Sequence, residues 1–251
     1  MSAAPDTRVR LFCLPYAGGS AYVFRDWSAP LAGAARIWPA ELPGRGARLH
    51  HEPLDDVGAV VDDLLPSILP AAGQPFAFLG YSYGALLAFE LARRLEYRYG
   101  LTARHLFVAA MRAPTWPSPG PPQSRLPDRE LDAYLRDLGG TPEEVLANEA
   151  LMSVMHPIVR ADLRAVEGYA YRPLPRLSCP VTALGGTSDA GVSAASLRAW
   201  RACTDGRFTL RMLQGGHFFL HAARDELLQI IRSGVAPDRD SDLLVPAEGR
   251  Q

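Results

Sequence analysis

The chain has 251 residues, of which 48% are apolar, and its formal net charge is −1. This size and composition allow one large α/β domain, or two small ones, with a sizeable buried core. The near-zero charge argues against a nucleic-acid-binding protein, because no strong positive field would attract phosphate groups. No stretch approaches the roughly 20 apolar residues of a membrane span, and the N-terminus lacks the apolar core of a secretory signal. We therefore expect a soluble cytoplasmic protein.

Apolar runs that predict strands alternate with segments of helical periodicity along most of the chain. The expected strands lie at residues 9–14, 36–42, 76–79, 105–111, 180–184 and 207–213. The expected helices lie at about 21–31, 57–68, 83–98, 193–203 and 218–232, and Asp55 or Asp56 can cap the second of them. This alternation implies a mainly parallel sheet with helices on both faces. We expect one domain over residues 9–234, between disordered tails at 1–8 and 235–251.

The alternation is interrupted from residue 112 to about residue 172, where no strand pattern occurs. Five prolines between residues 114 and 122 predict an extended linker, because each denies a helix an N–H group. Three short helices are expected after it. The first has an apolar stripe at Leu131, Tyr134, Leu135 and Leu138, the second begins with a capping box at 141–144, and the third runs from about Pro157 to Tyr169. We interpret this block as a helical insertion over the end of the sheet.

The central strand leads directly into the motif Gly80-Tyr81-Ser82-Tyr83-Gly84, which a helix follows. In a Gly-x-Ser-x-Gly motif with this context, the serine occupies a strained turn with its hydroxyl exposed above a sheet. A side chain at either glycine would crowd a turn in which strand and helix nearly touch. The N-terminus of the helix points at the serine and favours the negative charge of an oxyanion. We therefore predict a nucleophilic Ser82 and not an ordinary turn serine.

A serine hydroxyl needs a base, and in this architecture the triad follows the order serine, acid, histidine. His217 follows a predicted strand downstream of Ser82 and is the candidate base. Asp189 ends the loop after an earlier strand and is the candidate acid. Its rival, Asp205, belongs to a Thr-Asp-Gly turn, where an aspartate caps its own backbone. The other histidines fit packing or surface roles better, although His156 in the insertion could contact a substrate.

An oxyanion hole needs two N–H donors. One is expected from the backbone of Tyr83, directly after the nucleophile, and the other from the loop after the first strand. That loop reads Tyr16-Ala17-Gly18-Gly19, and we favour the N–H of Ala17. The alternative is that these glycines only make a tight turn. The loop, Ser82, Asp189 and His217 all follow predicted strands, at the rim where open α/β sheets bind ligands.

The three cysteines, Cys13, Cys179 and Cys203, are widely spaced and show neither metal-ligand spacing nor a disulfide framework. Cys13 and Cys179 lie in apolar, strand-like runs, so we expect buried thiols. We expect no metal and no cofactor, and nothing in the sequence demands more than a monomer.

Seven motifs span about residues 9–233: LPYAGGSAYVFRDW, ELPGR, GYSYGALLAFELA, LGGTPEEVL, RAD, CPVTALGG and GGHFFL. In these motifs and in their order the chain resembles the type II thioesterases, free-standing α/β-hydrolases that serve modular polyketide and non-ribosomal peptide synthases. The resemblance implies an α/β-hydrolase fold, a triad of Ser82, Asp189 and His217, and a mobile lid at about residues 113–170. It further implies hydrolysis of acyl groups from the phosphopantetheine arm of acyl or peptidyl carrier proteins, mainly to clear short chains that stall the assembly line.

Two positions depart from the family pattern. Tyr81 stands where the family usually has a histidine before the nucleophile, and Tyr16 replaces the histidine of a Pro-His-Ala-Gly-Gly loop. Neither position supplies a triad atom, so we expect activity to survive, with a changed acyl preference or pH response.

Two other functions remain compatible with parts of the pattern. A carboxylesterase or lipase would use the same triad on free esters, and an inactive hydrolase fold could serve as a binding module. The second predicts loss of a triad member, yet all three are present. Arg125, Arg129 or Arg160 could meet an acidic carrier protein, although solvated surface charge is the simpler interpretation of any single arginine.

Overall fold

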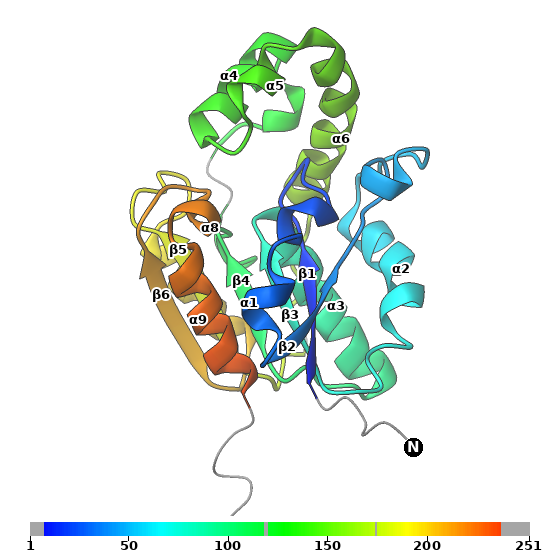
Figure 1. Ribbon diagram of the computed structural model, residues 1–251, viewed down its shortest axis with the longest axis vertical. Helices are drawn as coiled ribbons and strands as arrows, with labels where there is room; N and C mark the ends of the chain where they lie inside the picture. Colours follow the sequence, from blue (N-terminus) through cyan, green and yellow to red (C-terminus); the bar gives the residue numbers. More distant parts are fainter. Residues whose placement is uncertain (1–7, 118–119, 174, 237–251) are drawn as a thin grey trace, which may run out of the picture.

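The computed structural model describes residues 8–117, 120–173 and 175–236. Within them, six strands form one parallel sheet in the order β2-β1-β3-β4-β5-β6 (Figure 1). The strands are β1 (Val9–Leu14), β2 (Ala35–Pro39), β3 (Phe76–Tyr81), β4 (Leu106–Ala109), β5 (Val181–Gly186) and β6 (Phe208–Leu213). The expected parallel sheet is therefore confirmed. The expected tails lie almost entirely outside the described residues.

Two separate hydrophobic cores lie on the two faces of the sheet, because strand side chains alternate between faces. In β1, Phe12 and Leu14 join one core, and Leu11 and Cys13 join the other. The first core is covered by α2 (Val57–Ile68), α3 (Tyr83–Tyr99), α7 (Ala194–Arg198) and the 3₁₀-helix η4 (Ala199–Cys203). The second is covered by η1 (Ala21–Phe24), α1 (Ser28–Leu31), α8 (Phe219–Ala222) and α9 (Arg224–Val235). Helices thus cover both faces, as expected.

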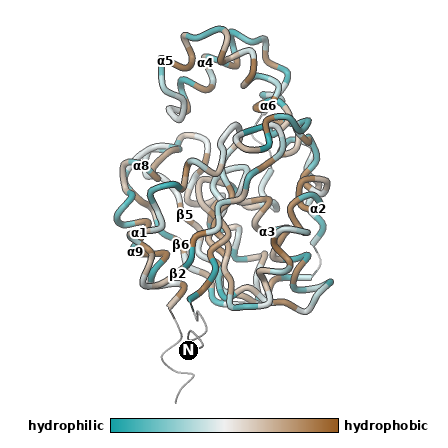
Figure 2. Tube along the Cα trace, turned by 45° about the vertical axis from the view of Figure 1, so that its right-hand side comes forward, coloured by the Kyte–Doolittle hydropathy of each residue, from teal (hydrophilic) through white to brown (hydrophobic). Residues whose placement is uncertain are grey.

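The helical insertion lies above the carboxyl ends of the strands. It consists of η3 (Gln123–Arg125), α4 (Asp128–Leu138), α5 (Glu143–Leu146) and α6 (Glu149–Gly168). In two views (Figures 1 and 2), α4 and α5 stand apart from the sheet, and α6 runs from them down to the body. We refer to residues 120–170 as the lid. Among the described residues, no helix is long and apolar enough to cross a membrane.

Several element boundaries differ from the sequence expectation. The expected helix 21–31 is split into η1 and α1, because Phe24 and Trp27 are both buried and their rings pack edge-on, at a spacing that suits a 3₁₀ turn. The expected helices 193–203 and 218–232 are likewise each two shorter helices. The glycines after the fifth strand, expected in a loop, belong to β5, where a side chain on Gly186 would collide with the Gly216 carbonyl, 2.1 Å from its Cβ.

The lid helices also differ at their starts. Helix α6 begins well before Pro157, because the side chain of Asn148 accepts a hydrogen bond from the Leu151 N–H and caps it. Pro157 is tolerated inside the helix on its exposed side, where water can satisfy the carbonyl that loses its N–H partner. The capping box expected at 141–144 was wrong, since Pro142 occupies the cap position of α5 and offers no side-chain hydrogen bond.

Candidate active site

The strand order brings four loops together at the carboxyl edge of the sheet. They follow β1, β3, β5 and β6, and they carry Ala17, Ser82, Asp189 and His217. All four of these residues line one cavity of about 670 Å³. This volume lies in the range of pockets that bind small molecules. The sequence therefore placed all four candidate positions at the correct edge.

Ser82 sits on a strained turn between β3 and α3. Its backbone has φ 52° and ψ −120°, in the positive-φ region that non-glycine residues rarely adopt. The turn is so tight that a Cβ on Gly80 would lie 2.2 Å from the Gly84 carbonyl oxygen, and one on Gly84 would lie 2.2 Å from that of Leu14. The two glycines therefore allow strand, helix and the β1 loop to meet at the serine.

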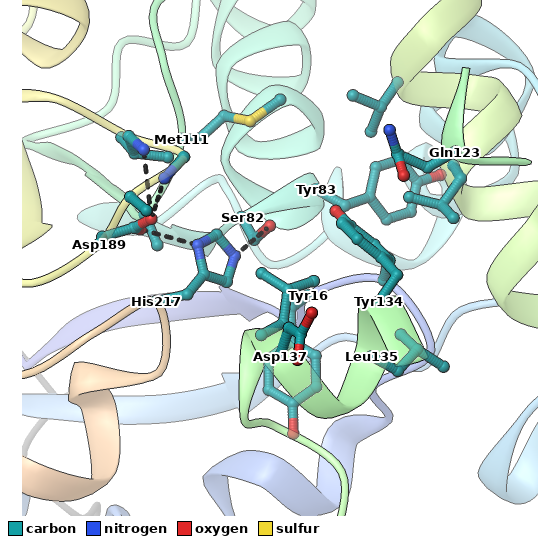
Figure 3. A pocket seen from close by; sticks show the side chains of 18 of the residues that line it. Tyr16, Ser82, Tyr83, Met111, Gln123, Tyr134, Leu135, Asp137, Asp189 and His217 are labelled. Atoms are coloured by element: carbon teal, nitrogen blue, oxygen red, sulfur yellow. Dashed lines mark hydrogen bonds and ion pairs between the residues drawn. The ribbon is translucent and has the colours of Figure 1, made fainter. Parts of the chain in front are cut away.

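His217 lies between Ser82 and Asp189 (Figure 3). Its Nε2 is 3.1 Å from the Ser82 hydroxyl oxygen, and its Nδ1 is 2.8 Å from Oδ2 of Asp189. The side chain of Asp189 is only 2% exposed, and that of His217 is 13% exposed. Three side chains that are far apart in the sequence thus form one continuous hydrogen-bonded chain.

The Asp189 carboxylate is fixed by its own loop. Its Oδ1 accepts hydrogen bonds from the N–H groups of Gly191, at 2.9 Å, and Val192, at 3.2 Å. This leaves Oδ2 for His217. The rival acid, Asp205, has a side chain that is 70% exposed and pairs with Arg176 at 3.2 Å. Asp205 therefore lies at the surface, paired with a different residue, and only Asp189 meets His217.

The side chain of Tyr81 forms hydrogen bonds with the backbone of the loop that carries His217. Its hydroxyl donates a 2.6 Å hydrogen bond to the His217 carbonyl and accepts one from the Leu220 N–H. Its ring stacks on Phe218, and burial raises its pKa, which keeps the hydroxyl proton available for donation. The tyrosine that departs from the family pattern thus contacts the backbone of the candidate base.

Ala17 and Tyr83 lie on the other side of the serine. Both line the cavity, and Tyr83 is the first residue of α3, where helices leave backbone N–H groups without intrahelical partners. The β1 loop makes a turn closed by a 2.9 Å hydrogen bond from the Gly19 N–H to the Tyr16 carbonyl. The two backbone segments proposed to hold an oxyanion therefore border the same space as the Ser82 hydroxyl.

The lid forms much of the cavity wall. Helix α4 contributes Tyr134, Leu135 and Leu138, and α6 contributes Val159, Leu163 and Val166. Tyr134 and Leu135 lie across the cavity from the Ser82–His217 pair (Figure 3). Of the apolar stripe expected on α4, Leu131 is buried and the other three residues face the cavity.

A buried ion pair beside the site was not predicted from the sequence. Arg45 and Asp162 are 4% and 0% exposed, and two of their N–O distances are 2.5 and 2.9 Å. The only sequence signal was that both belong to motifs of the family resemblance, ELPGR and RAD. Arg160, a candidate for partner contact, donates hydrogen bonds within the lid to Asp128 and the Ser124 carbonyl.

Three of the other five histidines lie away from the candidate triad. His105 is buried and its Nε2 lies 2.8 Å from the Thr182 hydroxyl. His156 pairs within the lid, with its Nε2 2.7 Å from Oδ1 of Asp132. His221 is exposed in the last turn of α8.

Comparison with known proteins adds the family to this geometry. A family model described as "Thioesterase domain" matches residues 9–234. The chain belongs to the thioesterase family. It is 40% identical over 231 residues to a Brevibacillus parabrevis protein named linear gramicidin dehydrogenase LgrE, covering 91% of this chain and 88% of that one. It is 39% identical to the gramicidin S biosynthesis protein GrsT of Aneurinibacillus migulanus, covering 89% and 88%.

A solved structure gives the same result. The type II thioesterase BorB from the borrelidin biosynthetic cluster is 42% identical, with a TM-score of 0.85, over 93% of this chain and 95% of that one. The resemblance to the type II thioesterases and the α/β-hydrolase fold are thus confirmed. The expected serine hydrolase activity on thioesters is confirmed with them, which removes the inactive binding module as an alternative.

Proposed function

We propose that Ser82, His217 and Asp189 are the catalytic triad of this thioesterase, with the N–H groups of Ala17 and Tyr83 as its oxyanion hole. The observation that carries the proposal is the hydrogen-bonded chain from the Ser82 hydroxyl through both nitrogens of His217 to Asp189, at 3.1 and 2.8 Å. In the neutral imidazole, Nδ1 donates to Asp189 and Nε2 is free to accept the Ser82 proton.

Acylation of the enzyme follows from this arrangement. His217 takes the Ser82 proton as the hydroxyl oxygen attacks the thioester carbonyl, and the two N–H groups bind the oxyanion that forms. The protonated His217 then gives its proton to the departing thiolate, and an acyl-serine remains. Asp189 stabilises the imidazolium throughout without taking up its proton.

Deacylation repeats the same steps with water. His217 removes a proton from a water molecule, whose oxygen attacks the acyl-serine carbonyl, and the oxyanion forms again in the same place. Collapse of this intermediate breaks the ester bond, and His217 returns the proton to the Ser82 oxygen. The product is a free carboxylic acid, and the enzyme is restored.

The substrate we propose is an acyl group on the phosphopantetheine arm of an acyl or peptidyl carrier protein. Two observations support this. One relative of the chain is named as a gramicidin S biosynthesis protein and another as a linear gramicidin dehydrogenase, and a structural neighbour is a type II thioesterase from the borrelidin biosynthetic cluster. The cavity of about 670 Å³ also runs from Ser82 to the apolar side chains of the lid, with room for an acyl group. The proposed role is editing, in which acyl groups that stall a synthase are removed.

The test compares the wild-type enzyme with Ser82→Ala on a panel of acyl-loaded carrier proteins. We expect Ser82→Ala to lose at least about 10³-fold in kcat while keeping the melting temperature of the wild type within a few degrees. Equal rates for the two folded proteins would refute the assignment.

The same panel should include free nitrophenyl esters of matched chain length. Carrier-bound thioesters are expected to react with the higher kcat/KM, and short acyl groups to be removed without regard to the identity of the synthase. Faster hydrolysis of the free esters would favour the carboxylesterase alternative.

A further inference from the structure

Asp162 joins the lid to the loop that carries Ala17. It lies in the C-terminal half of α6, and both of its carboxylate oxygens accept hydrogen bonds. Oδ2 accepts a 2.8 Å hydrogen bond from the Gly18 N–H and a 2.5 Å bond from one Arg45 nitrogen, and Oδ1 accepts a 2.9 Å bond from another. Since the side chain is completely buried, these bonds form without competition from water.

Arg45 is fixed before it meets Asp162. Its Nε and one terminal nitrogen each donate a 3.1 Å hydrogen bond to the Pro43 carbonyl, within its own loop. The guanidinium therefore presents its remaining donors to Asp162 in a set direction, in the paired geometry that suits a carboxylate. The ion pair thus fixes α6 to the loop after β2.

The bond to Gly18 acts directly on the β1 loop. Gly18 has φ 75°, at the third position of the turn that the Gly19 N–H closes onto Tyr16. A positive φ there is typical of a type II turn, in which the central peptide is flipped relative to a type I turn. The Gly18 N–H belongs to this peptide, so its bond to Asp162 holds one of the two possible orientations.

Close packing supports the same arrangement. A Cβ on Gly18 would lie 2.8 Å from a methyl group of Val159, one turn before Asp162 on α6. The loop therefore touches the helix with no space for a side chain, and a shift of α6 moves the loop with it.

We propose that Asp162 is a positioning residue, which holds the Tyr16–Gly19 turn so that the Ala17 N–H faces the Ser82 oxyanion. This inference rests on the proposed oxyanion hole. Its consequence is that hydrolysis requires α6 to be seated on the body, because the lid helix itself supplies the group that holds one half of the hole. A lid that lifts away therefore switches off the chemistry as well as opening the cavity.

The principal variant is Arg45→Met with Asp162→Leu. Replacing a buried ion pair by apolar side chains of similar volume often preserves the fold, whereas removing one partner leaves an unpaired buried charge. The pair of substitutions removes every acceptor for the Gly18 N–H on α6. Asp162→Asn is the second variant: its amide oxygen can take the place of Oδ2, which accepts from both Gly18 and Arg45, while its N–H₂ group replaces Oδ1 and ends the ion pair. Asp132→Asn is the matched control, because it weakens the His156 pair within the lid and leaves Gly18 untouched.

Three measurements separate positioning from simple structural support. We expect kcat of the double variant on a short acyl N-acetylcysteamine thioester to fall about 10²-fold, as for loss of one oxyanion donor, with KM within about threefold of the wild type. The affinity for an alkyl boronic acid, whose adduct with Ser82 places an oxygen in the hole, should fall in parallel. The affinity for a thioether analogue without a carbonyl should stay unchanged.

Asp162→Asn keeps an acceptor for the Gly18 N–H, so it should lose less than about tenfold in kcat, well short of the double variant. Asp132→Asn should behave as the wild type. The proposal is overturned by a folded double variant with kcat within about threefold of the wild type, by a loss in Asp162→Asn as large as that in the double variant, or by equal losses of affinity for boronic acid and thioether. Ser82→Ala, measured in parallel, tests the triad separately: turnover by that variant would refute the proposed function, whatever the result for Asp162.

Discussion

The hydroxyl of Tyr81 donates a 2.6 Å hydrogen bond to the backbone carbonyl of His217. Tyr81 is completely buried at the end of β3, directly before the proposed nucleophile, so strand β3 positions both Ser82 and the loop of its proposed base. Where the family usually places a histidine, this chain therefore has a longer side chain that reaches beneath the neighbouring loop. Tyrosine thus replaces the family's histidine by another polar side chain, and its hydroxyl donates to the His217 carbonyl.

Tyr81→Phe should weaken both stability and catalysis. It leaves the His217 carbonyl without its buried donor, which costs about 1–2 kcal/mol and lowers the melting temperature by about 2–8 °C. The looser loop should also lower kcat about tenfold, because small displacements of a catalytic group are costly. Calorimetry and steady-state kinetics check both, with Tyr22→Phe as the control, since Tyr22 is 65% exposed. An unchanged kcat would show that the loop is held by other contacts.

Tyr83→Phe should have the opposite effect on stability. The Tyr83 hydroxyl is buried and has no hydrogen-bond partner among the described residues, although its ring lines the cavity. Removing an unsatisfied buried hydroxyl without changing the shape of the side chain is neutral or favourable, so the free energy of unfolding should rise by about 1 kcal/mol. Urea titration checks this. A decrease would indicate that the hydroxyl has a partner in solution, such as a bound water.

Asp189→Asn should reduce kcat strongly and leave the fold intact. An asparagine keeps the oxygen that accepts from Gly191 and Val192, but it presents an amide N–H₂ to His217. The amide favours the imidazole tautomer whose proton is on Nε2, which cannot accept the Ser82 proton. We therefore expect kcat to fall about 10³- to 10⁴-fold. Asp205→Asn is the matched control, because Asp205 is exposed and should leave kcat unchanged. A similar loss in the two variants would contradict the assignment of the acid.

The residues of the proposed triad could be predicted because their signals are local. Each of Ser82, Asp189 and His217 lies within four residues of the end of a strand, and parallel strands bring their carboxyl ends to one edge. The Arg45–Asp162 pair has no such signal, since its partners are 117 positions apart and meet only once α6 lies on the body. An arginine and an aspartate in isolation are read as surface charges.

The helix boundaries show the same limit. Pro157 was a reasonable start for a helix, yet Asn148 and tertiary packing carry α6 through it. The split of helix 21–31 depends on the burial of Phe24 and Trp27, which the local pattern does not specify. Periodicity therefore indicated where helices lie, and packing decided where they begin and break.

The cysteines should be unreactive in the native enzyme. Burial raises the pKa of Cys179 to about 12 and that of Cys203 to about 11, and it raises the pKa of Cys13 as well. At pH 8 we expect iodoacetamide to label these thiols only after denaturation, as counted by mass spectrometry. The unfolded thiols ionise near pH 9.0, and the folded ones only at higher pH. The contribution of the neutral buried thiols to the stability of the fold is therefore fully present below pH 9 and is lost as pH rises through 11 to 12. Rapid labelling of the native protein would contradict their burial.

The acyl chain length should depend on Val166. This residue of α6 lines both the main cavity and an adjoining pocket of about 100 Å³, which also includes Trp116 and Tyr169. Val166→Phe places a larger side chain where the two spaces meet. Each methylene that loses its apolar contacts costs about 1–3 kcal/mol in specificity, so the ratio of kcat/KM for octanoyl over acetyl thioesters should fall at least about tenfold.

The control for this prediction is Arg164→Phe, which adds an aromatic ring to the exposed side of the same helix. Arg164 forms only a surface ion pair with Asp55, at 3.0 Å, and contributes little to stability. The two variants therefore separate a change in the cavity from a general effect of a larger side chain on the lid. If Val166→Phe leaves the octanoyl-to-acetyl ratio unchanged while Arg164→Phe does the same, long acyl chains do not enter the adjoining pocket and must leave Ser82 in another direction.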